Sequence, residues 1–141
     1  LNMETLWQQA YPSECVIVRP TGIYGTSVAR MIKLAETTKS YPKLHWSNRI
    51  HIDDLVAFLA LLLHVEHTEK SYICSNSQPL PLHEIIQWFQ QQLGLPVLVL
   101  ESAVSSGKQI HATRMQQMNF ELQHPHCFDD YLALLAERES K

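Results

Sequence analysis

The chain has 141 residues, which suits one domain across residues 1–141 and leaves little room for a second. Hydrophobic residues make up 45% and charged residues 18%, so the composition favours a packed globular core over a disordered chain. The formal net charge of -3 argues against binding to nucleic acid or to an anionic membrane surface. No apolar stretch reaches the roughly 20 residues that a membrane span needs.

Cysteine usage indicates the compartment. Cys15, Cys74 and Cys127 are odd in number and far apart, which is typical of free thiols in a reducing environment. We therefore expect a cytoplasmic protein. Because Leu1 stands where a complete translation product would carry Met, we interpret the chain as a piece of a longer protein.

The first third of the chain predicts helices around one strand. Residues 15–18 form a continuous apolar, largely β-branched run, typical of a strand covered on both faces within a parallel sheet. The strand is flanked by a helix over 1–10 and a glycine- and proline-containing loop over 19–25. A helix then runs from Thr26 or Ser27 to Thr38, and residues 39–46 form a connector with a short strand at its end.

The rest of the chain repeats this alternation. Asp53 and Asp54 predict the N-cap and first-turn acids of a helix that runs to His64, is apolar on every face and lies at the centre of the core. The remaining predicted segments are strands over 71–75 and 95–100, a mobile connector over 101–108, and helices over 82–93, 113–118 and 128–137, with Gly94 capping the first of these helices. Strands separated by helices predict an α/β fold.

Gly22-Ile23-Tyr24-Gly25 lies between a strand and a helix, where a dinucleotide-binding loop would also lie. Two features of that loop are missing. Val28 occupies the third small position, and no acid ends the next strand to hold a ribose. The segment is better explained as a turn that needs glycine conformations, although a turn at the carboxyl end of a strand still lies where α/β ligands bind.

Arg49 is the clearest candidate for an anion contact. A guanidinium near the start of a helix can hold a diphosphate in bidentate fashion with help from the helical N–H groups. The alternative is an ion pair from Arg49 to Asp53 or Asp54 that only orients the helix, and composition alone favours this alternative.

Metal and nucleophile chemistry have weak support. His64 and His67 lie one turn apart, and His124-Pro125-His126-Cys127 forms a cluster, but no C-x-x-C or similar ligand spacing is present. We expect His64 and His67 to cap the carbonyl end of a helix instead. No serine or cysteine stands in an activating pattern, so we assign no catalytic residue and no metal ligand.

Two motifs in order resemble the NAD-dependent epimerase/dehydratase family, the extended and atypical short-chain dehydrogenase/reductases. The first is Val18-Arg19-Pro20-Thr21-Gly22-Ile23-Tyr24-Gly25, and the second is Asn48-Arg49-Ile50-His51-Ile52-Asp53-Asp54-Leu55. Tyr72-Ile73-Cys74 and Gly107-Lys108 look similar to later family features. The resemblance covers nearly the whole chain but only the carboxyl half of the family pattern.

The resemblance implies the C-terminal part of a Rossmann-like fold, with few, mostly parallel strands and flanking helices. It implies NAD or NADP as cofactor of the intact parent and none for this segment alone, which lacks the glycine-rich loop and the Tyr-x-x-x-Lys pair and should be inactive by itself. The implied cofactor contacts are Pro20, Thr21 and Gly22, and the implied substrate contacts are Tyr24, Asn48 and Arg49. The resemblance implies a small-molecule substrate, with a nucleotide sugar as one candidate. The wording Asn48-Arg49-Ile50-His51 is most similar to atypical members, so the parent is left open between an epimerase/dehydratase, a reductase, a nucleotide-sensing protein and an inactive member.

One departure concerns the substrate. The family commonly has Pro and Gly after Tyr-Gly, whereas Thr26 and Ser27 stand here, so specificity is left open. A different class of function is a non-catalytic binding or oligomerisation module that uses this fold for protein contacts. A sheet without its neighbours exposes the edge of the strand over 15–18, so we expect a homo-oligomer, with segment swapping as one route to it.

Overall fold

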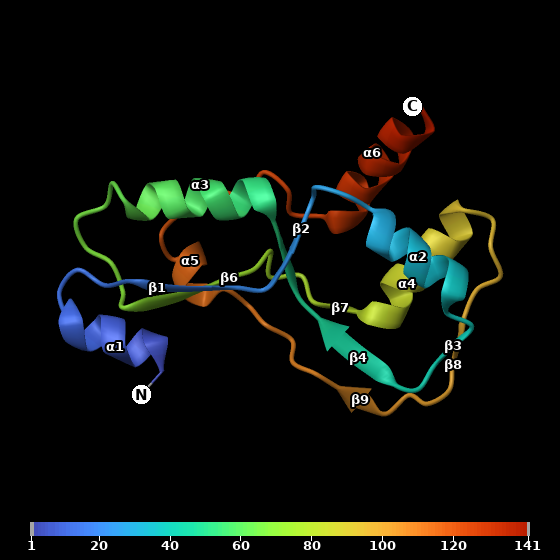
Figure 1. Ribbon diagram of the computed structural model, residues 1–141, viewed down its shortest axis with the longest axis horizontal. Coiled ribbons are helices and arrows are strands. Elements are labelled where there is room, and N and C mark those ends of the chain that lie inside the picture. Colours follow the sequence, from blue (N-terminus) through green and yellow to red (C-terminus); the bar gives the residue numbers. More distant parts are fainter. Residues whose placement is uncertain (1, 141) are drawn as a thin grey trace.

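Short strands alternate with helices along the chain, and the computed structural model describes residues 2–140 (Figure 1). Leu1, where the first predicted helix begins, lies outside the described residues. The helices are α1 (Met3–Ala10), α2 (Ala29–Thr37), α3 (Ile52–Leu62), α4 (Leu82–Gln92), α5 (Thr113–Gln116) and α6 (Cys127–Glu139). The strands are β1 (Ile17–Pro20), β2 (Gly22–Tyr24), β3 (Ser40–Tyr41), β4 (Leu44–Ser47), β5 (Arg49–His51), β6 (Ser71–Cys74), β7 (Leu80–Pro81), β8 (Val99–Leu100) and β9 (Ser105–Ser106).

The strands pair mainly in parallel. β1 pairs with β6, β2 with β5, β3 with β8, and β4 with β9, all in parallel, whereas β4 and β7 are antiparallel. Parallel neighbours need crossover connections, and the helices between them supply these connections. The prediction of an α/β fold with few, mostly parallel strands is confirmed.

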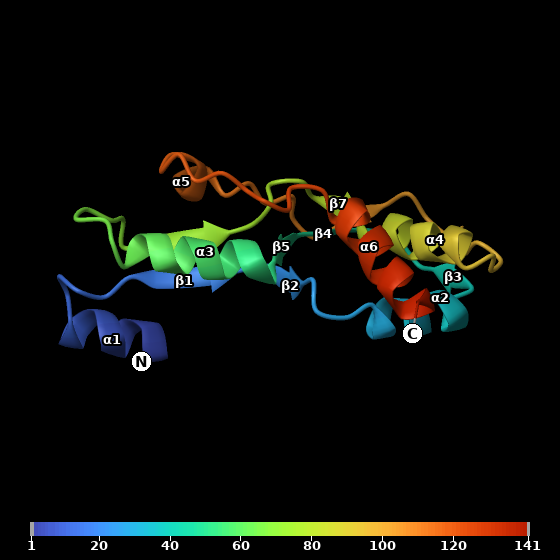
Figure 2. The same cartoon turned by 90° about the horizontal axis from the view of Figure 1, so that it is seen from above.

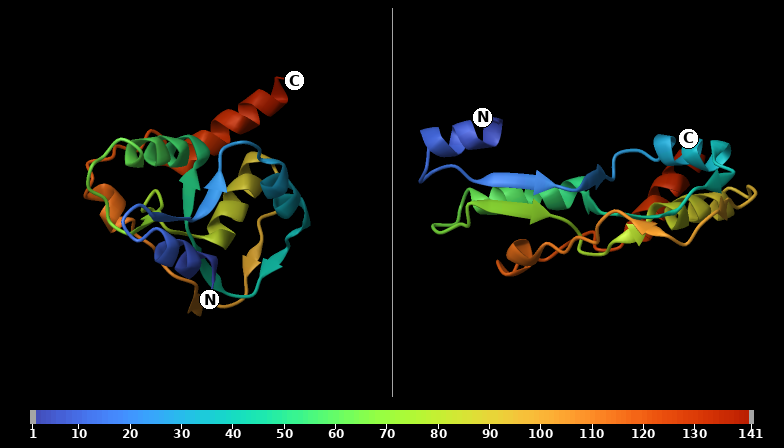
Figure 3. Two further views of the ribbon diagram at one scale, coloured as in Figure 1. Left: turned by 60° about the vertical axis from the view of Figure 1, so that its left-hand side comes forward. Right: turned by 90° about the horizontal axis from the view of Figure 1, so that it is seen from below.

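Two hydrophobic clusters divide the core between two ends of an elongated body (Figures 2 and 3). One cluster joins α2, α4 and α6 through Ile32, Phe89 and Tyr131. The other joins α3, β6 and α5 through Phe58, Tyr72 and Met115. Strands β2, β4 and β5 connect the two ends. Across residues 2–140, no helix combines the length and the apolar character needed to cross a bilayer.

The predicted strand over 15–18 is shifted and less buried than expected. β1 begins at Ile17, and Val16, Ile17 and Val18 are only half-buried. β1 pairs with β6 alone among the described strands, so its other edge is unpaired. In Figure 2, α1 and α3 lie on opposite sides of β1. The β-branched run predicted a strand correctly, but it did not show how many neighbours the strand has.

Helix α3 differs from its prediction at both its start and its surface. The helix begins at Ile52, and the His51 side chain caps it by accepting from the backbone N–H of Asp53, so Asp53 is not the N-cap. Asp53 and Asp54 do lie in the first turn, as predicted. The expectation of a wholly buried helix is wrong, because Val56 is 57% exposed and Leu59 is 41% exposed.

Other predicted boundaries differ from the structure because strands of two or three residues leave no pattern in the local sequence. The predicted loop over 19–25 contains β2, and the predicted connector over 101–108 contains β9. The predicted strand over 95–100 forms pairs only at Val99–Leu100. Helix α2 begins at Ala29, whose N–H donates to the Ser27 hydroxyl. The helices over 82–93 and 128–137 are confirmed within one or two residues, and Gly94 has the positive φ of a helix end.

One buried amide ties three elements together. Gln90 of α4 has no exposed surface. Its Nε2 donates to the carbonyl oxygens of Ala35 and Thr38 at 3.1 and 2.8 Å, and its Oε1 accepts from the backbone N–H of Leu98 at 2.7 Å. These contacts hold the end of α2 and the segment before β8 against α4.

Replacing Gln90 by Met keeps the volume but leaves three backbone groups without partners. We expect Gln90→Met to lower the free energy of unfolding by roughly 2–4 kcal/mol, measured by urea denaturation. Gln91→Met, at an exposed position of the same helix, is the matched control and should change stability by less than about 0.5 kcal/mol. Equal effects of the two substitutions would show that the amide contacts do not hold these elements.

Candidate functional site

A recess of about 310 Å³ lies where β2 and β5 meet α2. Its walls combine apolar side chains from α2 and α4 with polar groups from the loop before α2 and from the β4–β5 turn. The apolar lining includes Met31, Leu34, Leu82 and Ile85. The polar lining includes Thr26, Ser27, Arg30, Ser47, Asn48 and Arg49. A ligand with one apolar part and one anionic part matches this lining.

The parallel pairing of β2 with β5 brings the two predicted motifs together. Gly22 is opposite Arg49 in the register, and Tyr24 is opposite His51. Three of the four residues, Gly22, Tyr24 and Arg49, line the recess, as does Asn48. The three predicted substrate contacts, Tyr24, Asn48 and Arg49, therefore lie together in the lining of this recess.

Arg49 is a buried cation with neutral partners. The residue is 5% exposed. Its guanidinium donates to the Ser47 hydroxyl at 2.5 Å and, more weakly, to the Gln78 carbonyl oxygen at 3.4 Å. The ion pairs within residues 2–140 join Arg19 to Glu4 and histidines to aspartates, so the predicted alternative of an ion pair from Arg49 to Asp53 or Asp54 is wrong. A buried guanidinium without a carboxylate is costly, and an anionic ligand would relieve that cost.

Asn48 uses its amide to hold another segment of the chain. Its Nδ2 donates to the carbonyl oxygen of Lys108 at 2.7 Å, and its Oδ1 accepts from the backbone N–H of Ile110 at 2.9 Å. The carbonyl oxygen of Asn48 accepts from the N–H of Gly22. Asn48 therefore helps to shape the recess, and its side-chain amide is already bonded within the protein.

Tyr24 belongs to a chain of hydrogen bonds that starts at the recess. Its hydroxyl donates to Asp130 Oδ2 at 2.7 Å, and Asp130 Oδ1 lies 2.6 Å from Nδ1 of His124. The His124 ring stacks on His51, with centroids 3.6 Å apart and planes within 8°. Through these contacts, α6 fixes the position of a side chain in the recess wall.

The environment of this network shifts two ionisable groups. Burial, the hydrogen bond to Asp130 and the charge of Asp130 together raise the pKa of Tyr24. Burial lowers the pKa of His124, but the hydrogen bond to Asp130 and the negative charges of Asp130, Asp54 and Asp53 raise it by more. The net result is a pKa of His124 above its usual value.

The predicted cofactor contacts lie at the carboxyl end of β1 and β6. Pro20 ends β1, and the N–H and hydroxyl groups of Thr21 both donate to the carbonyl oxygen of Cys74, at the end of β6. Gly22 follows, where an added Cβ would lie 3.1 Å from the Asn48 carbonyl oxygen. These three residues lie at the side of the sheet where α/β ligands bind. The Thr21 hydroxyl, their one polar side-chain group, is already bonded within the protein.

The histidine cluster considered for metal binding is split in the structure. His124 contacts Asp130, His126 contacts Gln78, and Cys127 is buried. His51, His124 and Asp130 do lie close enough to share an ion by distance. However, ring-nitrogen lone pairs lie in the ring planes, so two stacked imidazoles do not direct them at one point. His64 and His67 are exposed beyond the end of α3; the backbone N–H of His64 donates to the carbonyl oxygen of Leu61, but within residues 2–140 neither imidazole makes the predicted capping contact.

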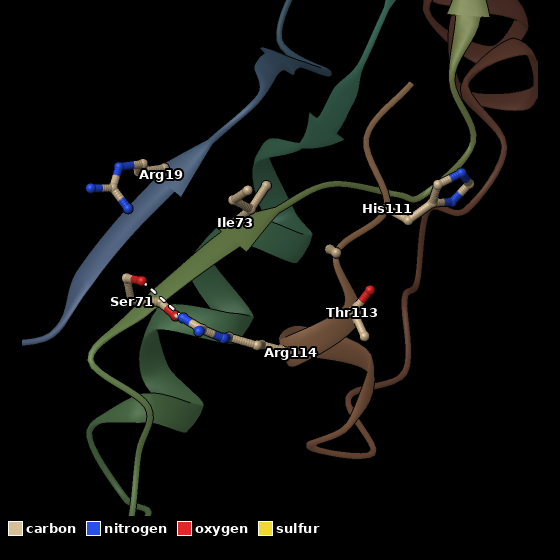
Figure 4. Close-up of a pocket in the computed structure, with 7 residues that line it drawn as sticks. Arg19, Ser71, Ile73, His111, Thr113 and Arg114 are labelled. Atoms are coloured by element: carbon tan, nitrogen blue, oxygen red, sulfur yellow. Dashed lines mark hydrogen bonds between the residues drawn. The ribbon is translucent and has the colours of Figure 1, made fainter. Parts of the chain in front are cut away.

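A second recess, of about 210 Å³, lies beside β6 and contains two arginines (Figure 4). Arg114 donates to the carbonyl oxygen and hydroxyl of Ser71, and Arg19 pairs with Glu4. Both guanidinium groups therefore have partners in the protein.

Several residues of the site had no sequence signal. Asp130 and His124 lie 106 and 100 positions from Tyr24 along the chain, and only the folded structure shows that they meet. Tyr131 also lines the recess, and burial together with the charge of Cys127 raises the pKa of Tyr131 to about 12. Arg30 could have been noticed, because it follows the Tyr-Gly motif by five residues.

Fold and site together define a Rossmann-like α/β protein with a recess bounded by β2, the start of β5 and helices α2 and α4. Solved structures narrow this class. A protein described as an NAD-dependent epimerase/dehydratase from Methylobacillus flagellatus is 31% identical, with a TM-score of 0.70, over 95% of this chain and 52% of its own. The chain therefore belongs to the NAD-dependent epimerase/dehydratase family, and its match to about half of such proteins is consistent with a C-terminal part.

Two further structures share the fold at lower identity. The dTDP-glucose 4,6-dehydratase of Bacillus anthracis, solved with NAD, is 15% identical with a TM-score of 0.70 over 98% of this chain and 49% of its own. The UDP-glucose 4-epimerase of Thermus thermophilus, also solved with NAD, is 12% identical with a TM-score of 0.59 over 84% and 45%. The chain thus spans about half the length of these proteins. No family sequence model and no curated protein sequence matches the chain.

The raised pKa of His124 predicts a pH-dependent contribution to stability. A histidine whose pKa is raised by folding stabilises the protein fully below its unfolded pKa, near 6.5, and loses that effect as pH rises through the folded pKa. We expect His124→Gln to lower the free energy of unfolding by about 1 kcal/mol more at pH 6 than at pH 9, measured by urea denaturation. The exposed His67→Gln is the control. A pH-independent loss in His124→Gln would contradict the proposed charge contact.

Proposed function

We propose that this chain supplies the substrate-binding part of an NAD(P)-dependent nucleotide-sugar epimerase/dehydratase-like oxidoreductase. The observation that carries the proposal is the buried, carboxylate-free guanidinium of Arg49 in the wall of the recess. The family membership and the nucleotide-sugar enzymes among the structural neighbours support the same conclusion.

The chemistry of the recess supports a nucleotide diphosphate as the bound group. Arg49 uses one strong and one weak hydrogen bond within the protein, which leaves further guanidinium N–H donors for an anion. A diphosphate accepts such donors in bidentate fashion. The apolar side chains of α2 and α4 would cover a base or sugar ring beside it.

The cofactor would lie against Pro20, Thr21 and Gly22 in the intact enzyme. These residues fit that role by position, since they stand at the carboxyl edge of β1 beside the recess. When bound, NAD or NADP supplies or accepts the hydride. This chain contains no Tyr-x-x-x-Lys pair and no glycine-rich phosphate loop, so we propose that it positions substrate and does not itself transfer protons or hydride. Its free cysteines support a reducing cytoplasm as its compartment.

Arg49 provides the test of this proposal. We expect the chain to bind UDP or dTDP in isothermal titration calorimetry, and Arg49→Met to weaken that binding roughly 10- to 100-fold because a charge-assisted contact is lost. Arg49→Lys, which keeps the charge, should lie between the two. Arg114→Met, outside the recess, is the matched control, and far-ultraviolet circular dichroism checks folding of each variant. Unchanged affinity in a folded Arg49→Met variant removes the site assignment.

A second candidate function is an assembly module, and two surfaces favour it. β1 has an unpaired edge among the described strands, and an unpaired edge can add a strand from another chain. Beside it, α1 exposes Met3, Leu6 and Trp7, and α3 exposes Val56 and Leu59. Apolar side chains gathered in this way are typical of contact surfaces.

We therefore expect the 141-residue chain to self-associate. Size-exclusion chromatography with light scattering should show a dimer or larger species whose proportion rises with concentration. Replacing exposed Leu59 and Leu63 by Lys should shift the chain toward the monomer, because burying the new charges would be unfavourable. The exposed pair Val99 and Val104 at the other end of the molecule, changed to Lys, is the control. A monodisperse monomer at all concentrations contradicts this expectation.

A further inference from the structure

We propose that protonated His124 fastens the start of α6 to the first turn of α3 and, through Asp130, holds Tyr24 in the recess wall, so that this part of the molecule loosens as pH rises. His124 is a positioning residue, because it lies outside the described lining of the recess and acts through Asp130. It also lies outside both family motifs. The inference is independent of which ligand the recess takes.

Three carboxylates from two helices meet around the His124 ring. Nδ1 of His124 lies 2.6 Å from Asp130 Oδ1 on α6, and Nε2 lies 3.4 Å from Asp53 Oδ2 on α3. Asp54 accepts from the backbone N–H of His124 at 2.9 Å. Within residues 2–140, no lysine or arginine forms an ion pair with any of these three carboxylates. Their negative charge therefore favours a positive charge on the imidazole between them.

His51, the ring on which His124 stacks, is neutral. Its Nδ1 accepts from the backbone N–H of Asp53 at 3.0 Å, so that nitrogen carries no proton. The two ring centroids lie 3.6 Å apart, where two imidazolium charges would repel each other. On its other side, His51 meets the ring of Tyr24 at 85°. Of the two stacked rings, His124 is therefore the one that carries the extra proton.

A charged His124 ring and a neutral one hold different numbers of partners. The imidazolium donates from both nitrogens, and its contacts with Asp130 and Asp53 form what we name the His124 clasp between α6 and α3. A neutral ring has a single N–H, so one carboxylate loses its donor and the negative charges repel each other without compensation. Asp130 also accepts from the Tyr24 hydroxyl, so a displaced Asp130 no longer fixes Tyr24.

The start of α6 is the part that responds. The helix projects from the rest of the molecule (Figures 1 and 3), and residues 136–140 are exposed. Tyr131 and Leu135 attach its middle through apolar packing, which a change of charge does not alter. Cys127, the first residue of α6, is buried and becomes accessible when this start loosens. Cys74 is also buried but belongs to the other hydrophobic cluster, so it provides an internal reference.

Thiol labelling tests the His124 clasp. In the 141-residue chain with Cys15→Ser, mass spectrometry follows the rates at which N-ethylmaleimide labels Cys127 and Cys74 between about pH 5.5 and 8.5. Burial raises the pKa of Cys74 to about 11 and that of Cys127 above its usual value, so both thiolate fractions rise equally with pH and cancel in the ratio of the two rates.

We expect the ratio of Cys127 to Cys74 labelling to rise roughly five- to tenfold across this range. The pKa of His124 is raised in the folded chain, so the clasp is complete below about pH 6.5 and is lost as pH rises through the folded pKa. The midpoint of the rise should coincide with the titration of the His124 ring in NMR spectra. Global unfolding would expose both thiols together and leave the ratio constant.

Variants separate the clasp from other sources of pH dependence. His124→Gln keeps a donor but not the charge, so the ratio should be high at every pH. Asp130→Asn should move the midpoint to lower pH by more than Asp53→Asn does, because Asp130 is the nearer and more buried carboxylate. His126→Gln is the matched control, since His126 is exposed beside Cys127 and contacts only Gln78 among the described side chains. It should leave the rise unchanged.

A double-mutant cycle of Tyr24→Phe and His124→Gln tests the connection to the recess wall. The effects of the two substitutions on the labelling ratio should be coupled by about threefold or more at pH 6, and the coupling should shrink by pH 8.5. A ratio that stays constant with pH, a rise that persists in His124→Gln, or a rise abolished in His126→Gln overturns the proposal. Independent effects at pH 6 overturn the part that concerns Tyr24.

Discussion

The parallel pairing of β2 with β5 is the constraint on which the site depends. This pair of three-residue strands sets Gly22 opposite Arg49 and Tyr24 opposite His51, and so brings together two motifs separated by more than twenty residues. The two glycines around it are required by geometry. Gly25 has a φ of +116°, and a Cβ added to it would lie 2.4 Å from His51 Nε2. A Cβ added to Gly22 would crowd the carbonyl oxygen of Asn48. The close approach of the strands therefore explains both glycines without a phosphate loop.

The C-terminal segment is attached to this strand pair by polar contacts. Asp54, fully buried at the start of α3, accepts from the backbone N–H groups of Gln123 and His124 at 2.8 and 2.9 Å. Asp130 then connects α6 to Tyr24 and His124. Carboxylates that accept several N–H or O–H donors tolerate burial well, and they set orientation more strictly than apolar packing does. The recess wall is thus held in place by residues a hundred positions away.

The sequence predicts this fold where local patterns decide the outcome. Ile85, Ile86 and Phe89 repeat at helical spacing and predict α4 almost to the residue, because the helix period is a local property. β2 was missed because it consists of three residues whose strand character comes only from pairing with β5. His51 was not expected as a cap, since a histidine side chain accepts a helix N–H only in one tautomer and one rotamer. For Arg49, composition favoured a neighbouring aspartate, but Asp54 is occupied by backbone groups and Asp53 lies beside the two histidines.

At Arg49, local stability and the proposed binding of an anion oppose each other. A guanidinium at 5% exposure loses most of its hydration, and the two neutral oxygens that it meets return only part of that free energy. An apolar side chain of similar volume would avoid this loss, so local stability gives no reason for an arginine at this position. Its placement is explained if the missing negative charge arrives with a ligand, because the desolvated cation then interacts with that charge more strongly than an exposed one would.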